Sequence, residues 1–419
     1  MAAINVISGE VLDWKPDPNS LIRSMAISES HNRLFVGNDF SEIAGQSHLS
    51  YIAAFDISSQ EPTIITDWDP DVNDHVQSIA IDENTVYISG MFSQVGVESR
   101  NYIAALDIED ASLLAFNPNA NGFVWDLFFA NDSVYASGTF TRIGSQDRGF
   151  LAQLNKATGF ATAWDPGGNA ETDAIAVYGN RIMIGGSTSL IKGQKRYNLA
   201  IINAATGNLQ HWSPSVNGEI STIHINNNKL YIGGTFSEIT NNNSAPETRN
   251  NIARFDLSTQ TLDSWDPNAD AWVRGIIVKN SNEIYVHGNF STIGGQTRYR
   301  LAAVDSNGTA TTWNPNTNPS NSVNAIAFYN DIIYIVGSFT EIGGQIRNNI
   351  AAIDASGNAT SWIANTDSYL SGITVHNDIA YIGSNYGTTS SNYGTITFGA
   401  TTIDRIAAVD TTKDTNNVT

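Results

Sequence analysis

The sequence predicts an all-β protein built from repeated units, and three observations carry that prediction. A Trp-centred unit recurs eight times at a spacing near 48 residues. Each period contains short segments rich in Ile, Val, Tyr and Ala and bounded by Gly, Asn, Asp and Pro, which is typical of β-strands. No segment shows the period of about 3.6 residues that a helix requires. Since such a repeat is typical of stacked supersecondary units, we expect one domain over residues 1–419.

The recurring unit is centred on an aromatic residue followed by Asx and Pro. Trp14 and Trp362 carry weaker copies, and Phe116 replaces the Trp in "FNPNAN". A large ring at a fixed position fills the gap between adjacent sheets, so we expect packing residues here. The clearest copies are "WDPDVN", "WDPGGN", "WSPSVN", "WDPNAD" and "WNPNTN", anchored on Trp68, Trp164, Trp212, Trp265 and Trp313.

Four segments recur within each period. Examples of the first three are "VQSIAI" from Val76, "YISGMF" from Tyr87 and "IAALD" from Ile103, and the fourth runs into the Trp. The first three are nearly continuous apolar runs, as expected of strands that are covered on both faces. Four-stranded antiparallel sheets stacked in a ring provide that burial, so the sequence predicts an eight-bladed β-propeller with the first strand innermost.

The ends of the chain predict how the ring closes. The first and third segments each occur eight times, but only "TTKDTNNVT" follows the last third segment, which ends at Asp410. A spare Trp-bearing segment, "GEVLDWKPD", precedes the first repeat at Leu21. We therefore expect residues 9–15 to supply the fourth strand of the last blade, with blades of about 48 residues from residue 21 onward. Such a clasp removes an open sheet edge.

The links between strands predict where a partner binds. The links from second to third and from fourth to first strands are long and polar, and both are expected on one face. Loops on a rigid scaffold commonly carry binding sites. The insertions "TNNNSAPET" in the fifth blade and "NYGTTSSNYGTITFGATT" in the eighth are expected to form the variable rim of that face.

Composition excludes several function classes. Asp plus Glu is 41 against 21 Lys plus Arg, a net charge of −20 that repels nucleic acid and anionic lipid. There is no cysteine, so disulfides and thiolate chemistry are excluded. We expect neither a nucleic-acid partner nor membrane insertion, because no apolar run approaches the roughly 20 residues of a spanning helix. The start "MAAINVISGEV" has no signal-peptide pattern.

The segment "VGSFTEIGGQIRNNIAAIDASGN", from Val336, resembles the delta-60 type of bacterial β-propeller repeat. That pattern is Gly-Gly-x-Phe-Thr, a Gly-Gly loop, an Arg and "IAxLD", and the first, fourth and eighth repeats here depart from it. The resemblance implies an extracellular or bacterial cell-surface protein, or a phage virion protein, with no assigned chemistry. Six repeats carry the Arg before the third strand: Arg100, Arg148, Arg196, Arg249, Arg298 and Arg347. We expect these residues to be scaffolding that ties loops together.

A weaker resemblance involves "AQLNKATGFATAW", from Ala152. It is similar to the tryptophan-docking motif of eight-bladed quinoprotein propellers, although most copies here are one residue longer. The dedicated loops for a calcium-bound quinone are not found in this sequence. Non-enzymatic relatives of that group are assembly scaffolds, and the resemblance implies that role.

One segment imitates the start of a calcium loop. "DPDVND" supplies Asp69, Asp71, Asn73 and Asp74 in an alternating pattern of oxygen ligands, but the distal Glu is missing. Asx side chains also cap turns by bonding their own backbone, and we favour that interpretation. We therefore expect no cofactor, with structural calcium at these four residues as the alternative.

Residues that differ between repeats are the best candidates for a binding site. The second position of the first strand reads Arg23, Gln77, Trp125, Asp173, Ser221, Arg274, Asn324 and Ser371. Trp125, Trp272 and Arg274, with Arg23 and Asp173, are candidates for a sugar- or peptide-binding patch, because aromatic rings and Arg dominate hot spots. Filling a wide channel with bulky side chains is the alternative.

No nucleophile elbow, phosphate loop, dinucleotide fingerprint or metal spacing of histidines is present. We expect a non-catalytic binding or scaffolding protein that contacts protein or glycan through one loop-rich face, in an oligomeric state that the sequence leaves open. One alternative is a glycan-active hydrolase or lyase at the channel mouth, using carboxylates such as Asp126, Asp173 and Asp270. Another is a structural protomer of a filament or virion.

Overall fold

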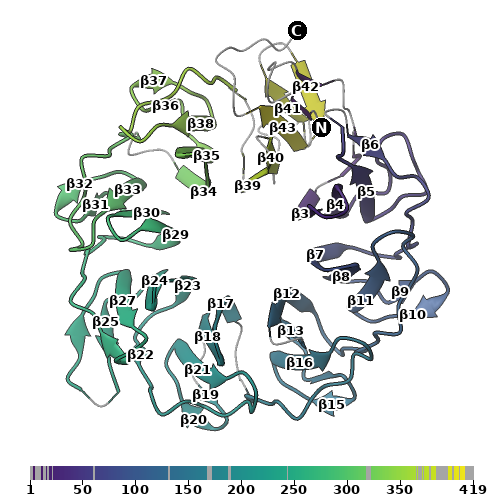
Figure 1. Cartoon of the computed structure of the whole chain (residues 1–419), viewed down its shortest axis with the longest axis horizontal. Helices are drawn as coiled ribbons and strands as arrows, with labels where there is room; N and C mark the ends of the chain where they lie inside the picture. The colour runs from purple at the N-terminus through teal and green to yellow at the C-terminus, as the bar shows by residue number, and fades with distance from the viewer. Residues whose placement is uncertain are drawn as a thin grey trace. The chain divides into compact units, whose positions relative to one another are not determined.

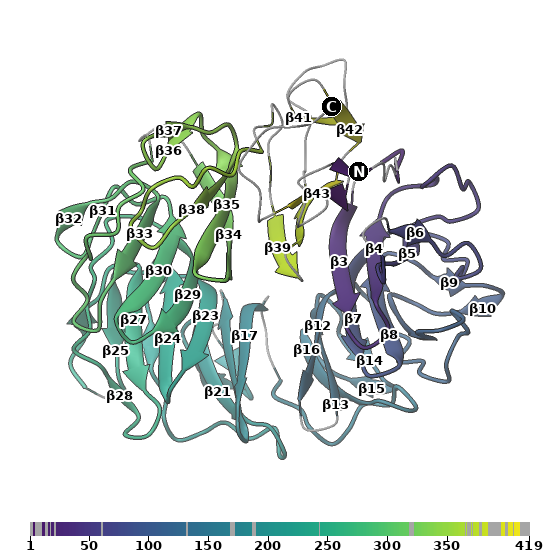
Figure 2. The same ribbon diagram turned by 45° about the horizontal axis from the view of Figure 1, so that its top comes forward.

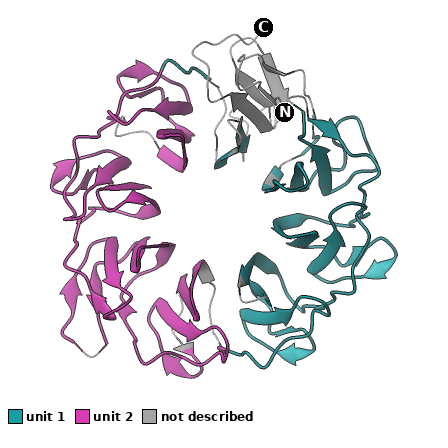
Figure 3. Cartoon of the chain, viewed as in Figure 1, with its two compact units in different colours: residues 1–165, 361–419 teal, residues 166–360 magenta. Residues whose placement is uncertain are grey.

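The prediction of an all-β protein is confirmed. In the computed structural model the described residues contain no helix and form antiparallel sheets (Figure 1). They group into two compact units, Met1–Asp165 with Ser361–Thr419, and Pro166–Thr360 (Figure 3). One domain over residues 1–419 stays a prediction. The structure describes residues 3–4, 11–12, 16, 18–20, 22–59, 62–130, 133–167, 172–186, 190–242, 244–317, 322–364, 366, 370, 372–376, 379–383, 395–398, 401–404 and 406–410.

The first unit, as far as it is described, contains four sheets in which the first, second and third segments of one repeat pair in order. The strands are β3 (Ile22–Ser28), β4 (Arg33–Asn38), β5 (Ile52–Asp56) and β6 (Thr63–Ile64); β7 (Val76–Asp82), β8 (Thr85–Gly90) and β11 (Ile103–Asp107); β12 (Val124–Ala130), β13 (Ser133–Gly138) and β16 (Leu151–Asn155); and β39 (Gly372–His376), β40 (Ile379–Gly383) and β43 (Ile406–Asp410).

The second unit contains four more sheets of the same order within its described residues. The strands are β17 (Thr172–Tyr178), β18 (Arg181–Gly186) and β21 (Leu199–Asn203); β23 (Ile220–Asn226), β24 (Lys229–Gly234), β27 (Ile252–Asp256) and β28 (Thr261–Leu262); β29 (Val273–Asn280), β30 (Glu283–Gly288) and β33 (Leu301–Val304); and β34 (Ser322–Tyr329), β35 (Ile332–Ser338) and β38 (Ile350–Ile353).

Consecutive sheets within a unit bury each other. One apolar cluster joins Phe35 and Trp68 of the first repeat to Ile88 and Leu106 of the second, and similar clusters join later repeats. Second and third strands are buried along almost their whole length, whereas first strands are only half-buried. The first strands of consecutive repeats lie beside one another, as β3, β7 and β12 do in one unit and β23, β29 and β34 do in the other (Figure 2).

The fourth segment is shorter than predicted. Among the described residues, only β6 and β28 form a fourth strand, each of two residues. In five other described repeats the segment makes a single bridge, such as Leu106 with Leu113. The backbone then turns toward the next sheet, because the Trp ring packs there rather than continuing the ladder. Trp68 Nε1 donates to the carbonyl of Asp107 in the following sheet, 3.2 Å away.

The predicted role of the repeated Trp as a packing residue is confirmed. Trp164 and Trp265 are 1% exposed, and Phe116 is fully buried in the same place. Trp265 meets Tyr231 of its own second strand edge to face at 5.4 Å, whereas Trp212 meets Phe255 of the next sheet at 5.5 Å. Such pairs add about 0.5–1.5 kcal/mol beyond area burial.

The links between second and third strands contain a two-stranded hairpin that the sequence pattern did not predict. Both turn residues have positive φ in most repeats, as at Gly144 (59°) and Ser145 (65°), which is the type I′ geometry favoured in tight hairpins. Gly144 donates to the carbonyl of Pro118, and its own carbonyl accepts from Ala161. The hairpins at Gly144, Gly294 and Gly343 therefore pack against the fourth segments of their repeats, through bonds from Ala161, Ala310 and Ala359. The hairpin strands are β9 (Gln94–Val95) and β10 (Glu98–Ser99); β14 (Arg142–Ile143) and β15 (Gln146–Asp147); β19 (Leu190–Ile191) and β20 (Gln194–Lys195); β25 (Glu238–Thr240) and β26 (Glu247–Thr248), beside β22 (Ser215–Val216); β31 (Thr292–Ile293) and β32 (Gln296–Thr297); β36 (Glu341–Ile342) and β37 (Gln345–Ile346); and β41 (Thr395–Phe398) and β42 (Thr401–Asp404).

The predicted clasp stays a prediction, because only residues 11–12 of the range 9–15 are described. Within the described residues, β2 (Val11–Leu12) pairs with β1 (Ala3–Ile4), and β1 in turn lies beside β43 of the last sheet. Trp14 lies outside the described residues.

Candidate functional site

The second residue of the first strand, where the repeats vary most, lies in a β-bulge. In seven described repeats the strand pairing skips this residue. A bulged residue leaves the ladder and its side chain is redirected. The position that varies most between repeats in sequence is therefore also the position at which the strand pairing is interrupted. The bulged residues are Arg23, Gln77, Trp125, Asp173, Ser221, Arg274 and Asn324.

In the unit Pro166–Thr360 two predicted ligand-binding residues come together. The Arg274 guanidinium carbon lies 4.3 Å from the centre of the Trp272 ring, a distance typical of cation–π contact. Trp272 Nε1 donates to Ser221 Oγ, 2.8 Å away on the preceding first strand. Arg274 Nε is buried and has no hydrogen-bond partner in the described part of the chain. Ligand binding at this pair stays a prediction.

Trp125 belongs to the other unit and is 39% exposed. Its ring centre lies 5.5 Å from that of Phe123, which in turn lies 5.5 Å from Tyr102. The neighbouring Asp126 accepts from Ser78 Oγ at 3.2 Å, and burial raises the pKa of Asp126 above its usual value. Trp125 is thus part of a group of aromatic rings beside a carboxylate.

For the two remaining predicted ligand-binding residues, Arg23 and Asp173, the structure gives only the position in the backbone. Arg23 is the second residue of β3, and Asp173 is the second residue of β17. Their side chains lie outside the part of the structure that is described. Participation of Arg23 and Asp173 in ligand binding stays a prediction.

In seven described repeats the residue before the third strand has a left-handed backbone. The angle φ is 66° at Tyr51, 64° at Tyr102 and 64° at Phe150. Two hydrogen bonds impose this conformation: the Tyr102 N–H donates to the Phe92 carbonyl at 2.9 Å, and Gly90 N–H donates to the Tyr102 carbonyl at 3.0 Å. For a residue with a large side chain the left-handed region costs roughly 1–2 kcal/mol.

Other repeats meet the same backbone demand with asparagine. Asn198, Asn251 and Asn349 occupy this position with φ between 62° and 65°. Asn tolerates the left-handed region, and Asn251 also donates through Nδ2 to the Ala269 carbonyl at 2.8 Å. Strain that persists where a less strained residue is available points to a role for the side chain. Three consecutive repeats of the first unit retain an aromatic ring at that position.

We name the aromatic strip by five residues: Tyr51, His75, Tyr102, Phe123 and Trp125. The Tyr51 and His75 rings are 5.9 Å apart and form one group, and Tyr102, Phe123 and Trp125 form a second group through the contacts described above. Met91, 45% exposed, follows Gly90 and donates its N–H to the His75 carbonyl. The strip crosses three consecutive sheets at the ends where their first strands begin.

His75 joins the strip to two carboxylates. Its Nε2 lies 2.7 Å from Asp39 Oδ1, and its Nδ1 contacts Asp74 Oδ1. Asp39 follows β4 and Asp74 precedes β7, so His75 links two consecutive repeats.

Sequence reasoning missed Tyr51, Tyr102 and Phe150. The signal was available in an alignment of the repeats against one another. The residue before "IAxxD" is Asn in three repeats and aromatic in these three. A position where Asn alternates with bulky rings indicates positive φ.

The calcium candidates use their oxygens for turns. Asp69 Oδ1 accepts from the Asp71 N–H, and Asp71 itself has φ of 52°. Asn73 Oδ1 accepts from the N–H groups of Ser93 and Gln94, each at 3.0 Å. Among the described residues no cluster of three His, Cys, Asp or Glu residues could hold a metal ion. Calcium binding at Asp69, Asp71, Asn73 and Asp74 stays a prediction, and a calcium titration of the Asn73→Ala variant would test it.

The pair of hydrogen bonds that Asn73 accepts recurs in other repeats. Asn121 and Asn217 make the same pair of bonds to the start of the following hairpin link. Asp270 does so through Oδ1 to Ser291 and Thr292. Burial opposes ionisation of Asp270, but these bonds outweigh it and hold its pKa below the usual value. This structural use of Asp270 weighs against a catalytic role for it.

The repeated Arg is scaffolding, as predicted, but it ties different segments. Arg148 Nη2 donates to the Thr162 carbonyl at 2.7 Å and Nε donates to the Trp164 carbonyl at 3.2 Å. Arg298 Nη2 makes the equivalent bond to Thr311 at 2.8 Å. The guanidinium therefore joins a hairpin to the Trp segment of the same repeat, rather than to a neighbouring link.

The comparisons agree with this architecture. Residues 279–310 match a family model described as "Domain of unknown function (DUF5122) beta-propeller". None of the curated proteins is detectably similar in sequence. The described residues contain no helix that could cross a membrane.

Two solved structures share the fold. The computationally designed Ika8 protein is similar over 88% of this chain and 95% of its own, with 14% identity and a TM-score of 0.59. Sqt1 of Saccharomyces cerevisiae is similar over 94% of this chain and 97% of its own, with 9% identity and a TM-score of 0.55. With the family match and the repeated antiparallel sheets, the fold is that of a β-propeller.

Proposed function

We propose that this protein is a non-catalytic binding propeller that holds a protein partner on the aromatic strip. The observation that carries the proposal is the left-handed backbone of Tyr51 and Tyr102, at a position where three other repeats carry Asn and the sixth carries Arg300. Aromatic and Met side chains are enriched at protein interfaces, while singly exposed aromatic residues need no explanation. Here Trp125 of the strip and the neighbouring Met91 are both exposed within one unit.

The proposal is tested by selecting displayed peptides on the intact protein and measuring their affinity for variants. Trp125→Ala should weaken the selected peptides by 2 kcal/mol or more, roughly thirtyfold, as expected for a hot-spot residue. Phe160→Ala is the matched control, because Phe160 is 57% exposed and lies outside the strip. Selected peptides that bind both variants as well as the wild type would overturn the proposal.

A glycan is the second candidate ligand, and the pair Trp125 and Asp126 favours it. A flat exposed ring can stack on a sugar, and a carboxyl with a raised pKa beside it suits proton donation to a glycosidic oxygen. A glycan array combined with a hydrolysis screen distinguishes the cases. Turnover that is lost in Asp126→Asn would replace the scaffold proposal with the enzyme alternative.

We also propose that the ring has eight blades and that the N-terminal segment closes it. The contact of β1 with β43 supports closure. Deleting residues 1–15 should then expose a sheet edge and lower the melting temperature by several degrees. A truncated protein that melts like the full chain would contradict closure.

We propose an extracellular or bacterial cell-surface location, or a place in a phage virion. The acidic net charge of −20 supports a soluble surface that avoids nucleic acid. A structural protomer of a filament or virion is the alternative, and light scattering distinguishes it. A stable monomer at high concentration would count against the protomer.

A further inference from the structure

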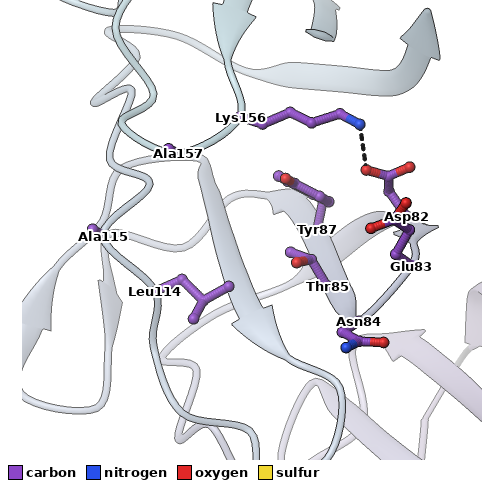
Figure 4. Close-up of a pocket in the computed structure, with 9 residues that line it drawn as sticks. All are labelled: Asp82, Glu83, Asn84, Thr85, Tyr87, Leu114, Ala115, Lys156 and Ala157. Atoms are coloured by element: carbon purple, nitrogen blue, oxygen red, sulfur yellow. Dashed lines mark ion pairs between the residues drawn. The ribbon is translucent and has the colours of Figure 1, made fainter. Parts of the chain in front are cut away.

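A cavity of about 440 Å³ lies at the other ends of the strands that carry the aromatic strip. Asp82 ends β7, Thr85 begins β8, and Glu83 lies in the turn between them. Lys156 follows β16 of the next sheet and closes the opposite side, with its Nζ 2.5 Å from Asp82 Oδ2 (Figure 4). The cavity therefore sits between two consecutive sheets of the unit Met1–Asp165 with Ser361–Thr419.

A threonine stands beside the cavity at a register where two other repeats carry arginine. Thr85 is paired with the last residue of its third strand, Asp107. Arg33 and Arg181 occupy the same register, opposite Asp56 and Asn203. A threonine side chain is too short to reach the next sheet, so the space that a guanidinium fills elsewhere stays open.

The two arginines show what this space accepts. Arg181 Nη1 donates to the carbonyl of Leu257, 3.0 Å away, which directly follows the third strand of the next sheet. Arg33 Nη1 donates to Ile108 O in the equivalent position and to Glu109 O at 3.0 Å, and Arg33 Nη2 lies 2.5 Å from Glu109 Oε2. Beside the cavity, Lys156 occupies the position equivalent to Leu257 and Ile108, directly after the third strand of the next sheet.

In a third repeat an arginine on a different strand places its guanidinium at the equivalent junction with the next sheet. Arg254 Nη2, from the third strand β27, donates to the Ser306 carbonyl at 3.4 Å. Ser306 stands two residues after β33. Guanidinium groups thus occupy this junction in three repeats, although two different strands supply them.

The charges at the cavity favour a cation. Two carboxylates, Asp82 and Glu83, face one ammonium, that of Lys156. Glu83 is exposed and makes no ion pair within the described residues. The Tyr87 side chain, in the cavity wall, supplies an apolar surface against which a flat guanidinium can lie.

We propose that this cavity binds a guanidinium group, that of an arginine side chain on a partner protein. The group takes the place that Arg33 and Arg181 fill in their own repeats, and the Glu83 carboxylate accepts its charge-assisted hydrogen bonds. This site is separate from the aromatic strip, so either can fail without the other.

The test uses N-acetylarginine amide as the probe, with amide chemical shifts of the full chain as the readout. We expect saturable shifts near Thr85 and Lys156, and weaker binding of N-acetyllysine amide. Glu83→Gln should reduce the affinity about fivefold or more, as expected for loss of one charge-assisted bond. Thr85→Arg should abolish binding by filling the cavity from within.

A gain of function provides the second arm. Arg33→Thr opens the equivalent space in the first repeat, where the Glu109 carboxylate that pairs with Arg33 remains, and should create an additional binding site for the probe. Shifts that never saturate, equal affinity for the lysine amide, or unchanged binding in Thr85→Arg would each overturn the proposal. If Thr85→Arg fails to fold, Glu83→Gln and the lysine comparison still decide.

Discussion

The indole Nε1 of Trp313 donates a hydrogen bond to the carbonyl oxygen of Asp354, which lies 2.8 Å away in the next sheet. Trp265 makes the same bond to Asp305, also at 2.8 Å. Its ring meanwhile packs on a second-strand tyrosine of its own sheet. The repeated Trp therefore fastens two consecutive sheets with one side chain.

Replacing Trp313 separates its two roles. Trp313→Phe keeps an aromatic ring but removes the donor to Asp354, so we expect a loss of about 1 kcal/mol in unfolding free energy. Trp313→Ala also removes the ring and should cost about 3–5 kcal/mol. Urea denaturation measures both. The second repeat carries Phe116 at this position, and Phe116→Trp is the matched comparison: because Phe116 is fully buried, the larger ring should cost about 1–3 kcal/mol.

A charged network in the fifth repeat predicts a pH dependence of stability. Lys229 Nζ lies 2.9 Å from both Asp256 Oδ2 and Asp263 Oδ2, and Arg254 Nη2 lies 2.9 Å from Asp263 Oδ1. Burial opposes ionisation of Asp263, but bonds from Arg254 and Lys229 lower its pKa to about 2. The Ser258 hydroxyl, with Thr259 and Lys229, lowers the pKa of Asp256. The Asp263 bond raises the pKa of Lys229.

Because both carboxyls have folded pKa values below 3.8, their contribution is complete above that pH and is lost as pH falls toward 2. The Lys229 contribution is complete below 10.5 and is lost as pH rises through its raised pKa. Lys229→Met should therefore cost about 1 kcal/mol at pH 7, after allowing for solvent screening, and much less near pH 2. Equal losses at both values would contradict the assignment.

The sequence predicted the strands well because their signals are local. Second and third strands such as β8 and β11 are apolar runs that are buried on both faces, and both lie where expected. The bulge at Trp125 was marked by variation between repeats. Such features depend on residues that are close in sequence or that repeat.

Features that depend on contacts between segments escaped sequence reasoning. The fourth strand is short because the backbone at Trp68 turns to the next sheet, which strand propensity does not reveal. The hairpin at Gly144 was taken as a polar loop, although its glycine approaches the backbone of Ala161 too closely for any side chain. The aromatic strip was missed because the left-handed φ of Tyr102 follows from hydrogen bonds to Phe92 and Gly90.

The strained backbone at Tyr102 predicts a trade-off between stability and binding. Tyr102→Asn relieves roughly 1–2 kcal/mol of left-handed strain but loses a half-buried ring, so the unfolding free energy should stay within about 1 kcal/mol of wild type. Tyr102→Ala retains the strain and loses the ring, so it should be less stable than Tyr102→Asn. Thermal unfolding ranks them. A Tyr102→Asn protein less stable than Tyr102→Ala would contradict the account of strain.

Replacing Asp126 by Asn should stabilise the protein at pH 7, whereas Lys229→Met should destabilise it. Burial raises its folded pKa above the value of 3.8 expected when unfolded, so ionisation of Asp126 destabilises the fold. This penalty is absent below pH 3.8 and complete above the folded pKa. Asp126→Asn should therefore raise the melting temperature at pH 7 and leave it unchanged at pH 3. Asp110→Asn is the control, because bonds from Ser112 lower the pKa of Asp110, and its substitution should not stabilise the protein at either pH. If Asp126→Asn melts below wild type at pH 7, the prediction is contradicted. The hydrogen bonds that Asp126 accepts from Ser78 and Leu127 would then stabilise the fold more than burial of the charge destabilises it.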